Sequence, residues 1–345
     1  MPSRPDLLIT LRSFAVGAVG AGGAYLLSFP LYLITGPAIL ISLLGVTRMR
    51  FAIADPFRDA AFVIIGVSLG SGVNAEAREA FLRWPLAFLA LAVMLVIAMA
   101  AGRLVLARGF GFDDRSAVLA ATPGHLSFVL GISAEIGADV PRIAAVQAVR
   151  LLSLTLIVPL IAMAFGVDLG VGLSQPGEAM SIGSVLLLIV LGLGLGLVLK
   201  AMRVPAPLMI GPLLVSSVAH LTDLVPGTMP LPVATAGFIA IGTLIGTRFA
   251  AISLGALRRS LTAGLVSTSV TAALSALFAL PVAWAILMPP AHVLVAFAPG
   301  GLETMIAMGA PIGANPGFVA ACHVGRLLIL SVLMPVFLAR AGKAA

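Results

Sequence analysis

The sequence has one cysteine, few aromatic residues and few charges. Charged side chains make up 10% of its 345 residues and aromatic ones 6%. Cys322 has no second cysteine for an internal disulfide, and no cysteine-based metal site is expected. So little charge excludes an ordinary soluble domain. What the chain has instead is a hydrophobic fraction of 61% and a mean hydropathy of +1.18, which are typical of a membrane protein.

Long apolar runs define the fold class. The runs at 84–102 and 184–199 are long enough to cross a bilayer as helices. The 37 glycines and 23 prolines are unfavourable in soluble helices, but in membranes they permit close helix packing and irregular backbone. The first apolar stretch continues to about residue 34, so we expect an uncleaved first span rather than a signal peptide. The sequence therefore predicts an all-α polytopic membrane protein.

The net charge of +7 comes from basic residues spread singly and in pairs over short loops. They form no basic stripe of the kind that follows phosphates, so nucleic acid is not an expected partner. Because Lys and Arg are enriched in the cytoplasmic loops of membrane proteins, we interpret these residues as topology signals.

The chain resembles itself at an offset of 176 residues. A single shift that holds at many positions predicts a duplication, with a first membrane repeat at 1–170 and a second at 171–345. The matched positions are "FVIIGVSLG" (62–70) with "FIAIGTLIG" (238–246), Pro123-Gly124 with Pro299-Gly300, Gly137 with Gly313, Arg150 with Arg326 and Pro159 with Pro335.

Each half contains six apolar segments, and proline and glycine interrupt the fifth, near 116–140 and 290–315. If all twelve segments cross the bilayer, the halves are parallel. If the fifth dips in and returns, ten cross and the halves are inverted. The positive-inside rule favours the inverted arrangement, which places the second-half cations Lys200, Arg203, Arg248, Arg258 and Arg259 inside with the others. We therefore expect two inverted repeats of five spans each, with a broken or re-entrant Pro-Gly segment per repeat and both termini cytoplasmic.

Inverted repeats with irregular backbone at membrane depth are typical of secondary transporters, whose sites lie between the repeats. Helix N-termini created by such breaks attract anions. We accordingly predict that solute binds at the two breaks and at the polar side chains of the helices that follow them. The candidate residues are Pro123, Gly124, His125, Ser127 and Arg150 in the first half, and Pro299, Gly300, Gly301, Glu303, His323 and Arg326 in the second.

Three roles stay open for the intramembrane arginines Arg150 and Arg326. They cap backbone carbonyls or neutralise a carboxylate, they contact the solute, or they snorkel to the interface. Glu303 is the candidate proton or cation site, with a salt bridge to one arginine as its alternative. Asp139 is expected to cap the helix that begins near Pro141.

The histidines lack metal-ligand spacing such as H-x₃-H or H-E-x-x-H. Although His125 and His323 lie in the break regions, we predict polar packing or solute hydrogen bonding for them. No metal and no cofactor is expected.

The blocks "TPGHLSFVLGISAEIGADVPRIAAVQAVRLL" and "APGGLETMIAMGAPIGANPGFVAACHVGRLL" resemble the AbrB family of bacterial integral membrane proteins. The resemblance covers nearly the whole chain and implies a duplicated membrane domain in the bacterial inner membrane. Members carry the labels putative ammonia monooxygenase and regulator of gene expression. Oxygen activation on copper or iron needs clustered histidines, which four scattered ones do not supply, so the monooxygenase label is not supported.

The expected function is a secondary transporter or exporter of a small polar solute, anionic or zwitterionic, with proton coupling through Glu303. Any effect on gene expression would be indirect. Two alternatives stay open, a membrane sensor that binds a ligand and signals through a partner, and a metal-dependent enzyme. The expected partners are the lipid bilayer and the solute, with a homodimer left open.

Overall fold

The computed structural model describes residues 7–46, 49–71, 84–123, 126–164, 178–202, 204, 206–250, 254–309 and 312–341. These residues are almost entirely helical, and the β structure among them is an isolated bridge between Ala179 and Thr228. Seven of the described helices are long and apolar enough to cross a membrane. The prediction of an all-α membrane fold is therefore confirmed. The span-length segments are Leu7–Leu26, Trp84–Phe110, Val140–Leu160, Ile182–Ala201, Leu231–Arg248, Arg258–Ala285 and Pro316–Ala341.

The chain divides into two compact units, and each unit combines segments from both halves of the sequence. Unit 1 consists of Met1–Leu82, Pro159–Ala251 and Glu303–Ala320, and unit 2 consists of Arg83–Val158, Ile252–Leu302 and Ala321–Ala345. The predicted boundary between the repeats, at 170/171, lies outside the described residues.

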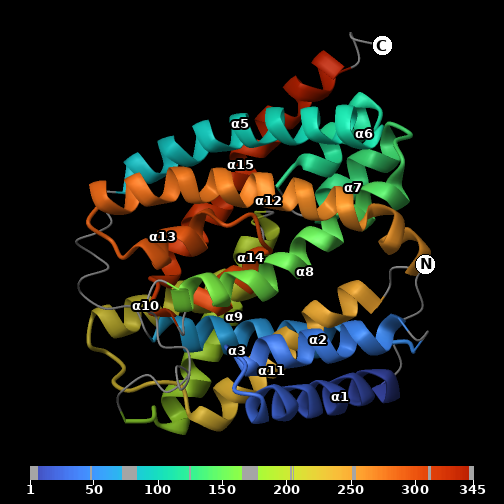
Figure 1. Cartoon of the computed structure of the whole chain (residues 1–345). Helices are drawn as coiled ribbons and strands as arrows, with labels where there is room; N and C mark the ends of the chain where they lie inside the picture. The colour runs from blue at the N-terminus through green and yellow to red at the C-terminus, as the bar shows by residue number, and fades with distance from the viewer. Residues whose placement is uncertain are drawn as a thin grey trace. The chain divides into compact units, whose positions relative to one another are not determined.

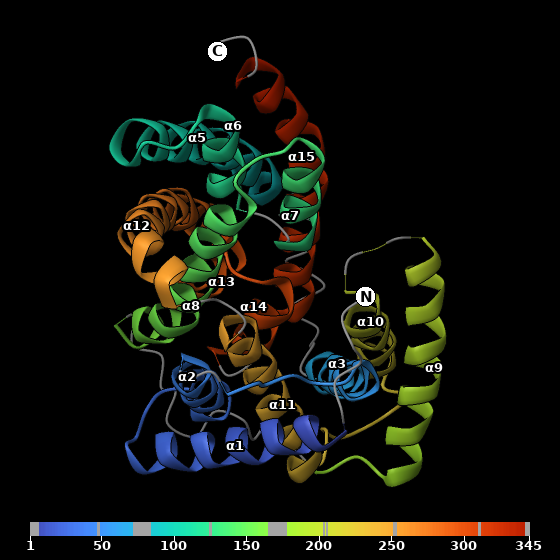
Figure 2. The same cartoon turned by 90° about the vertical axis from the view of Figure 1, so that its right-hand side faces the viewer.

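Unit 1 is built mainly from six helices whose glycines allow close approach. Helix α3 packs against α10, and α11 packs against α2 (Figure 2). A side chain at Gly66 of α3 would overlap the carbonyl oxygen of Met209 on α10, so only glycine fits there. The six helices are α1 (Leu7–Leu26), α2 (Tyr32–Val46), α3 (Asp55–Gly70), α9 (Ile182–Ala201), α10 (Pro207–Leu221) and α11 (Leu231–Ala250).

Unit 2 contains two long helices, α5 (Trp84–Phe110) and α12 (Leu254–Ala285), which lie side by side (Figure 1). They run antiparallel, because Ser275 contacts Met94 near one end while Ser267 lies beside Gly102 further along. The short helix α6 (Asp114–Ala121) packs on α5, where Ala121 faces Gly102. Asp113 caps the N-terminus of α6 by accepting a hydrogen bond from the Ser116 amide at 2.9 Å.

The fifth segment of each half consists of two short helices. In the first half α6 ends at Ala121 and α7 spans Leu126–Glu135. In the second, α13 (Pro290–Phe297) is followed by α14 (Leu302–Gly309). Thr122 and Ala298, which follow α6 and α13, are extended, with ψ of 117° and 133°. Each precedes a proline, which disfavours helical backbone in the residue before it.

A polar residue caps the helix that follows each broken segment. Asp139 accepts a hydrogen bond from the Arg142 amide at 3.2 Å at the start of α8 (Val140–Ala164), which confirms its predicted role. Asn315 does the same for the Phe318 amide at 3.1 Å at the start of α15 (Pro316–Ala341).

Candidate functional site

Helix α15 brings a buried arginine to the end of α13. The side chain of Arg326 is 2% exposed. Its Nη1 donates to the Ala298 carbonyl at 2.8 Å, and its Nη2 donates to the carbonyls of Phe297 at 2.9 Å and Ala296 at 3.2 Å. The last carbonyls of a helix lack intrahelical partners and carry partial negative charge. Arg326 therefore caps α13.

Helix α8 makes the corresponding arrangement at the end of α6. Arg150 is 4% exposed, and its Nη1 donates to the Thr122 carbonyl at 2.8 Å. Gln147, one turn earlier on the same face of α8, adds a second group of donor contacts. Its Nε2 lies 2.9 Å from the Leu119 carbonyl, 3.1 Å from that of Ala120 and 3.0 Å from that of Thr122. Two side chains thus hold the end of α6.

His323 occupies the place on α15 that Gln147 has on α8, but its contacts differ. Its imidazole is 3% exposed, and Nδ1 lies 3.4 Å from Nη1 of Arg326. The Val295 carbonyl also interacts with the ring. Its Nε2 is buried without a hydrogen-bond partner among the described residues. The end of α13 is therefore held mainly by Arg326.

These contacts select among the three predicted roles of the arginines. Both guanidinium groups are buried and bound to backbone carbonyls, so snorkelling to the interface is wrong and carbonyl capping is present. The two charges are close enough for Arg326 to act electrostatically on Arg150. Among the described residues, the ion pairs join Arg58 to Asp55 and Asp59, and Arg103 to Asp114, so no described carboxylate pairs with Arg326.

The other predicted site residues divide into three groups. Pro123 and Pro299 are buried beside the capped carbonyls, and Gly300 and Gly301 are partly exposed. Gly124 and His125 lie outside the described residues. Ser127 lies in α7 and Glu303 in α14, but the described part of the structure does not include their side chains.

Gln147 is the residue that sequence reasoning did not place in the site. Its spacing of three from Arg150 was a usable signal, since residues at i and i+3 share a helix face. No group of three His, Cys, Asp or Glu side chains that could hold a metal ion occurs in the described part of the chain.

Span-length apolar helices, together with short helices that end against buried arginines, define a polytopic α-helical membrane protein. The chain belongs to the AbrB family, because residues 33–341 match the family described as "Transition state regulatory protein AbrB". It is also similar to the uncharacterized protein YhjN of Bacillus subtilis (strain 168). The two are 23% identical over 292 residues, which cover 80% of this chain and 76% of YhjN.

Proposed function

We propose that this protein is a secondary transporter or exporter of a small polar solute in the bacterial inner membrane. The observation that carries the proposal is that α6 and α13 stop within unit 2 and that buried arginines hold their last carbonyls. Lipid cannot satisfy the polar groups of a helix end, so such backbone persists only where protein or a water-filled cavity surrounds it. Broken helices of this kind form the binding sites of many secondary transporters.

Paired packing contacts support two structural repeats within the proposed transporter. A side chain at Gly66 would meet the Met209 carbonyl, and one at Gly242 would meet that of Ile34. Gly242 lies 176 residues after Gly66, and Met209 lies 175 after Ile34. The two contacts therefore exchange helices between the halves in the same manner, as a duplicated and inverted pair would.

The cations of unit 2 support an arrangement with both termini in the cytoplasm. Because α5 and α12 are antiparallel, Arg108 near the end of α5 lies at the same end of the unit as Arg258 and Arg259 near the start of α12. These residues come from different halves of the sequence. Basic residues gather on the cytoplasmic side of membrane proteins, so this end would be cytoplasmic in an inverted pair of repeats.

Glu303 is the proposed proton-coupling residue. It is the second residue of α14, directly after the break at Pro299 to Gly301. A carboxylate near a helix N-terminus and near buried arginines is stabilised in its charged form, whereas a low-dielectric surrounding favours the neutral form. A balance between the two would allow proton uptake and release during each transport cycle.

The test is solute flux in proteoliposomes under an imposed pH gradient, with labelled small carboxylates, amino acids and amines as probes. We expect accumulation of one class to depend on the gradient. Glu303→Gln should remain folded and lose the gradient dependence, while Glu135→Gln, an exposed carboxylate at the end of α7, should behave as the parent. Absence of flux for every probe would overturn the transport proposal. Normal flux with an unchanged pH profile in Glu303→Gln would overturn the coupling role.

A further inference from the structure

Two neighbouring nitrogens on α15 are buried without an acceptor among the described residues. They are Nε of Arg326 and Nε2 of His323. The Nε of arginine always carries a hydrogen. Because the guanidinium only donates, the nearby Nδ1 of His323 acts as the acceptor at 3.4 Å, and the neutral imidazole then carries its proton on Nε2. Both nitrogens are thus donors, and a buried donor without an acceptor is costly.

The first half of the chain leaves no such pair of donors. At the matching position, Gln147 turns its amide nitrogen toward the carbonyls at the end of α6. The atom of Gln147 left without a partner is the acceptor Oε1. The excess of donors is therefore specific to α15, and it results from histidine standing where the first half has glutamine.

The local charge also calls for an anion. Arg150 and Arg326 contribute two positive charges, and Arg326 acts electrostatically on Arg150. The C-termini of α6 and α13 contribute about −0.5 each, so the sum of these four charges is about +1. A single negative charge would balance it, and burying an unbalanced charge at membrane depth is unfavourable.

We propose that Arg326 and His323 form a binding site for the carboxylate of a monovalent organic anion. Nε–H of Arg326 and Nε2–H of His323 donate to the carboxylate oxygens, while both Nη atoms of Arg326 keep their bonds to α13. A carboxylate fits because it offers two acceptor oxygens and one charge. The inference rests on the proposed function only in taking this anion to be the transported solute.

The sole cysteine provides a reporter for a binding test. Cys322 is fully buried in the folded protein and becomes accessible to a maleimide dye on unfolding. Thermal unfolding of the purified full chain is followed in acetate, lactate, succinate or phosphate, with chloride at equal ionic strength as the reference. A ligand that binds the folded state raises the unfolding temperature as its concentration increases. We expect acetate and lactate to do so, and succinate and phosphate to have little effect.

His323→Phe tests the histidine donor, because it preserves a ring and removes both nitrogens. We expect the apparent Kd for lactate to rise about tenfold or more, as for loss of a hydrogen bond to a charged group. The matched control is His220→Phe in unit 1, where the ring nitrogens contact the carbonyls of Ser216 at 2.7 Å and Gly227 at 3.0 Å. This control should alter the unfolding temperature but preserve the lactate-dependent shift.

Several results would overturn the assignment. These are stabilisation by none of the probes, stabilisation by phosphate alone, or an unchanged lactate Kd in His323→Phe. A shift that occurs only in Glu303→Gln would also overturn it, because an internal carboxylate would then occupy the site in the parent. If lactate binds through His323 but no probe is transported, the site stands and the transport proposal fails. If flux occurs without His323-dependent binding, only the site inference fails.

Discussion

Nη1 of Arg150 and Nη1 of Arg326 each lie 2.8 Å from a carbonyl oxygen 28 residues earlier in the chain, that of Thr122 and that of Ala298. Each carbonyl belongs to the residue before a proline, at the end of a short helix. Proline has no N–H group and ends the helix, so these carbonyls have no backbone donor. The guanidinium supplies the missing donor, which explains why proline and arginine occur together in both halves.

The first prediction concerns the removal of one capping arginine. Arg326→Ala deprives three buried carbonyls of their donor, whereas Arg259→Ala removes an exposed cation near the start of α12. We expect Arg326→Ala to lower the free energy of unfolding by on the order of 3 kcal/mol or to prevent folding, and Arg259→Ala to have little effect. Denaturant unfolding in detergent measures both. An Arg326→Gln variant with parental stability and activity would contradict the capping role.

The second prediction exchanges the residues that differ between the two halves. His323→Gln introduces at α13 the amide that Gln147 provides at α6, where it contacts three carbonyls. In the absence of carboxylates, we expect the free energy of unfolding to rise by about 1 kcal/mol. Gln147→Leu should lower it by a similar amount. A fall in the unfolding temperature of His323→Gln would mean that the α13 carbonyls need no further donor.

Local patterns in the sequence predicted the membrane fold and the cap at Asp139. Hydrophobic runs determine the spans by their length, and the cap follows from an acidic residue just before a helix. The prolines also marked the ends of α6 and α13, because the effect of proline on its own helix is local.

Contacts between distant residues could not be predicted in the same way. The sequence left three roles open for Arg326, because the choice depends on where the α13 carbonyls lie relative to α15. The contacts of Gln147 depend equally on the placement of α6 beside α8. The interleaving of both halves within each unit results from pairings such as α3 with α10, which no local pattern specifies.

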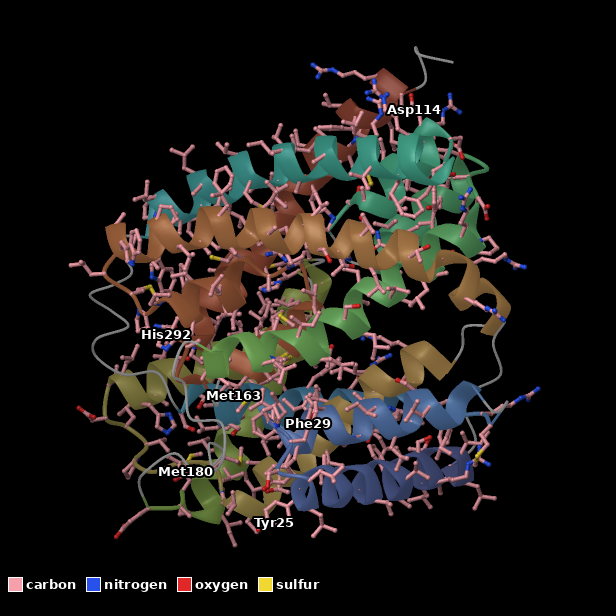
Figure 3. The ribbon with its side chains drawn as sticks, viewed as in Figure 1. Tyr25, Phe29, Asp114, Met163, Met180 and His292 are labelled. Carbon is pink, nitrogen blue, oxygen red and sulfur yellow. The ribbon has the colours of Figure 1, made fainter. Side chains whose placement is uncertain are left out.

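The third prediction is a pH dependence at the corner between α5 and α6. Asp114, at the start of α6 (Figure 3), accepts hydrogen bonds from Arg103 at 2.7 and 3.1 Å, and this contact lowers the pKa of Asp114. Its stabilising effect is therefore complete above the unfolded pKa of about 3.9 and is lost as the pH falls through the lower folded value. Unfolding temperatures measured across this range should fall in the parent and change less in Asp114→Asn. Equal slopes in both proteins would show that the pair contributes nothing.

The fourth prediction concerns membrane topology. In a Cys322→Ser background, a cysteine at Ser174 should react with an impermeant maleimide added outside intact cells. A cysteine near the C-terminus, at Ala341, should react only after the membrane is opened. The reason is the asymmetry of charge, because the loop at 166–181 carries no cation whereas Arg340 precedes Ala341. Labelling of Ser174→Cys only from the inside would exclude the inverted arrangement.

The last prediction uses matched glycines to test whether the halves are structurally equivalent. Gly66 on α3 and Gly242 on α11 lie 176 residues apart, and an added methyl group would overlap a backbone carbonyl of the partner helix in both cases. Backbone cannot move aside as a flexible side chain does, so each helix pair would have to separate. Gly66→Ala and Gly242→Ala should each lower the free energy of unfolding by about 1–3 kcal/mol, and by similar amounts.

The control for this pair is Gly194→Ala on α9, where an added methyl group meets nothing within 4 Å. Alanine favours the helix over glycine, so this variant should be as stable as the parent or slightly more stable. Equal losses at 66 and 242 with none at 194 would place equivalent helix contacts in the two halves. A large loss at only one of the two positions would mean that the duplicated sequences no longer pack alike, and the repeat would then be a feature of the sequence alone.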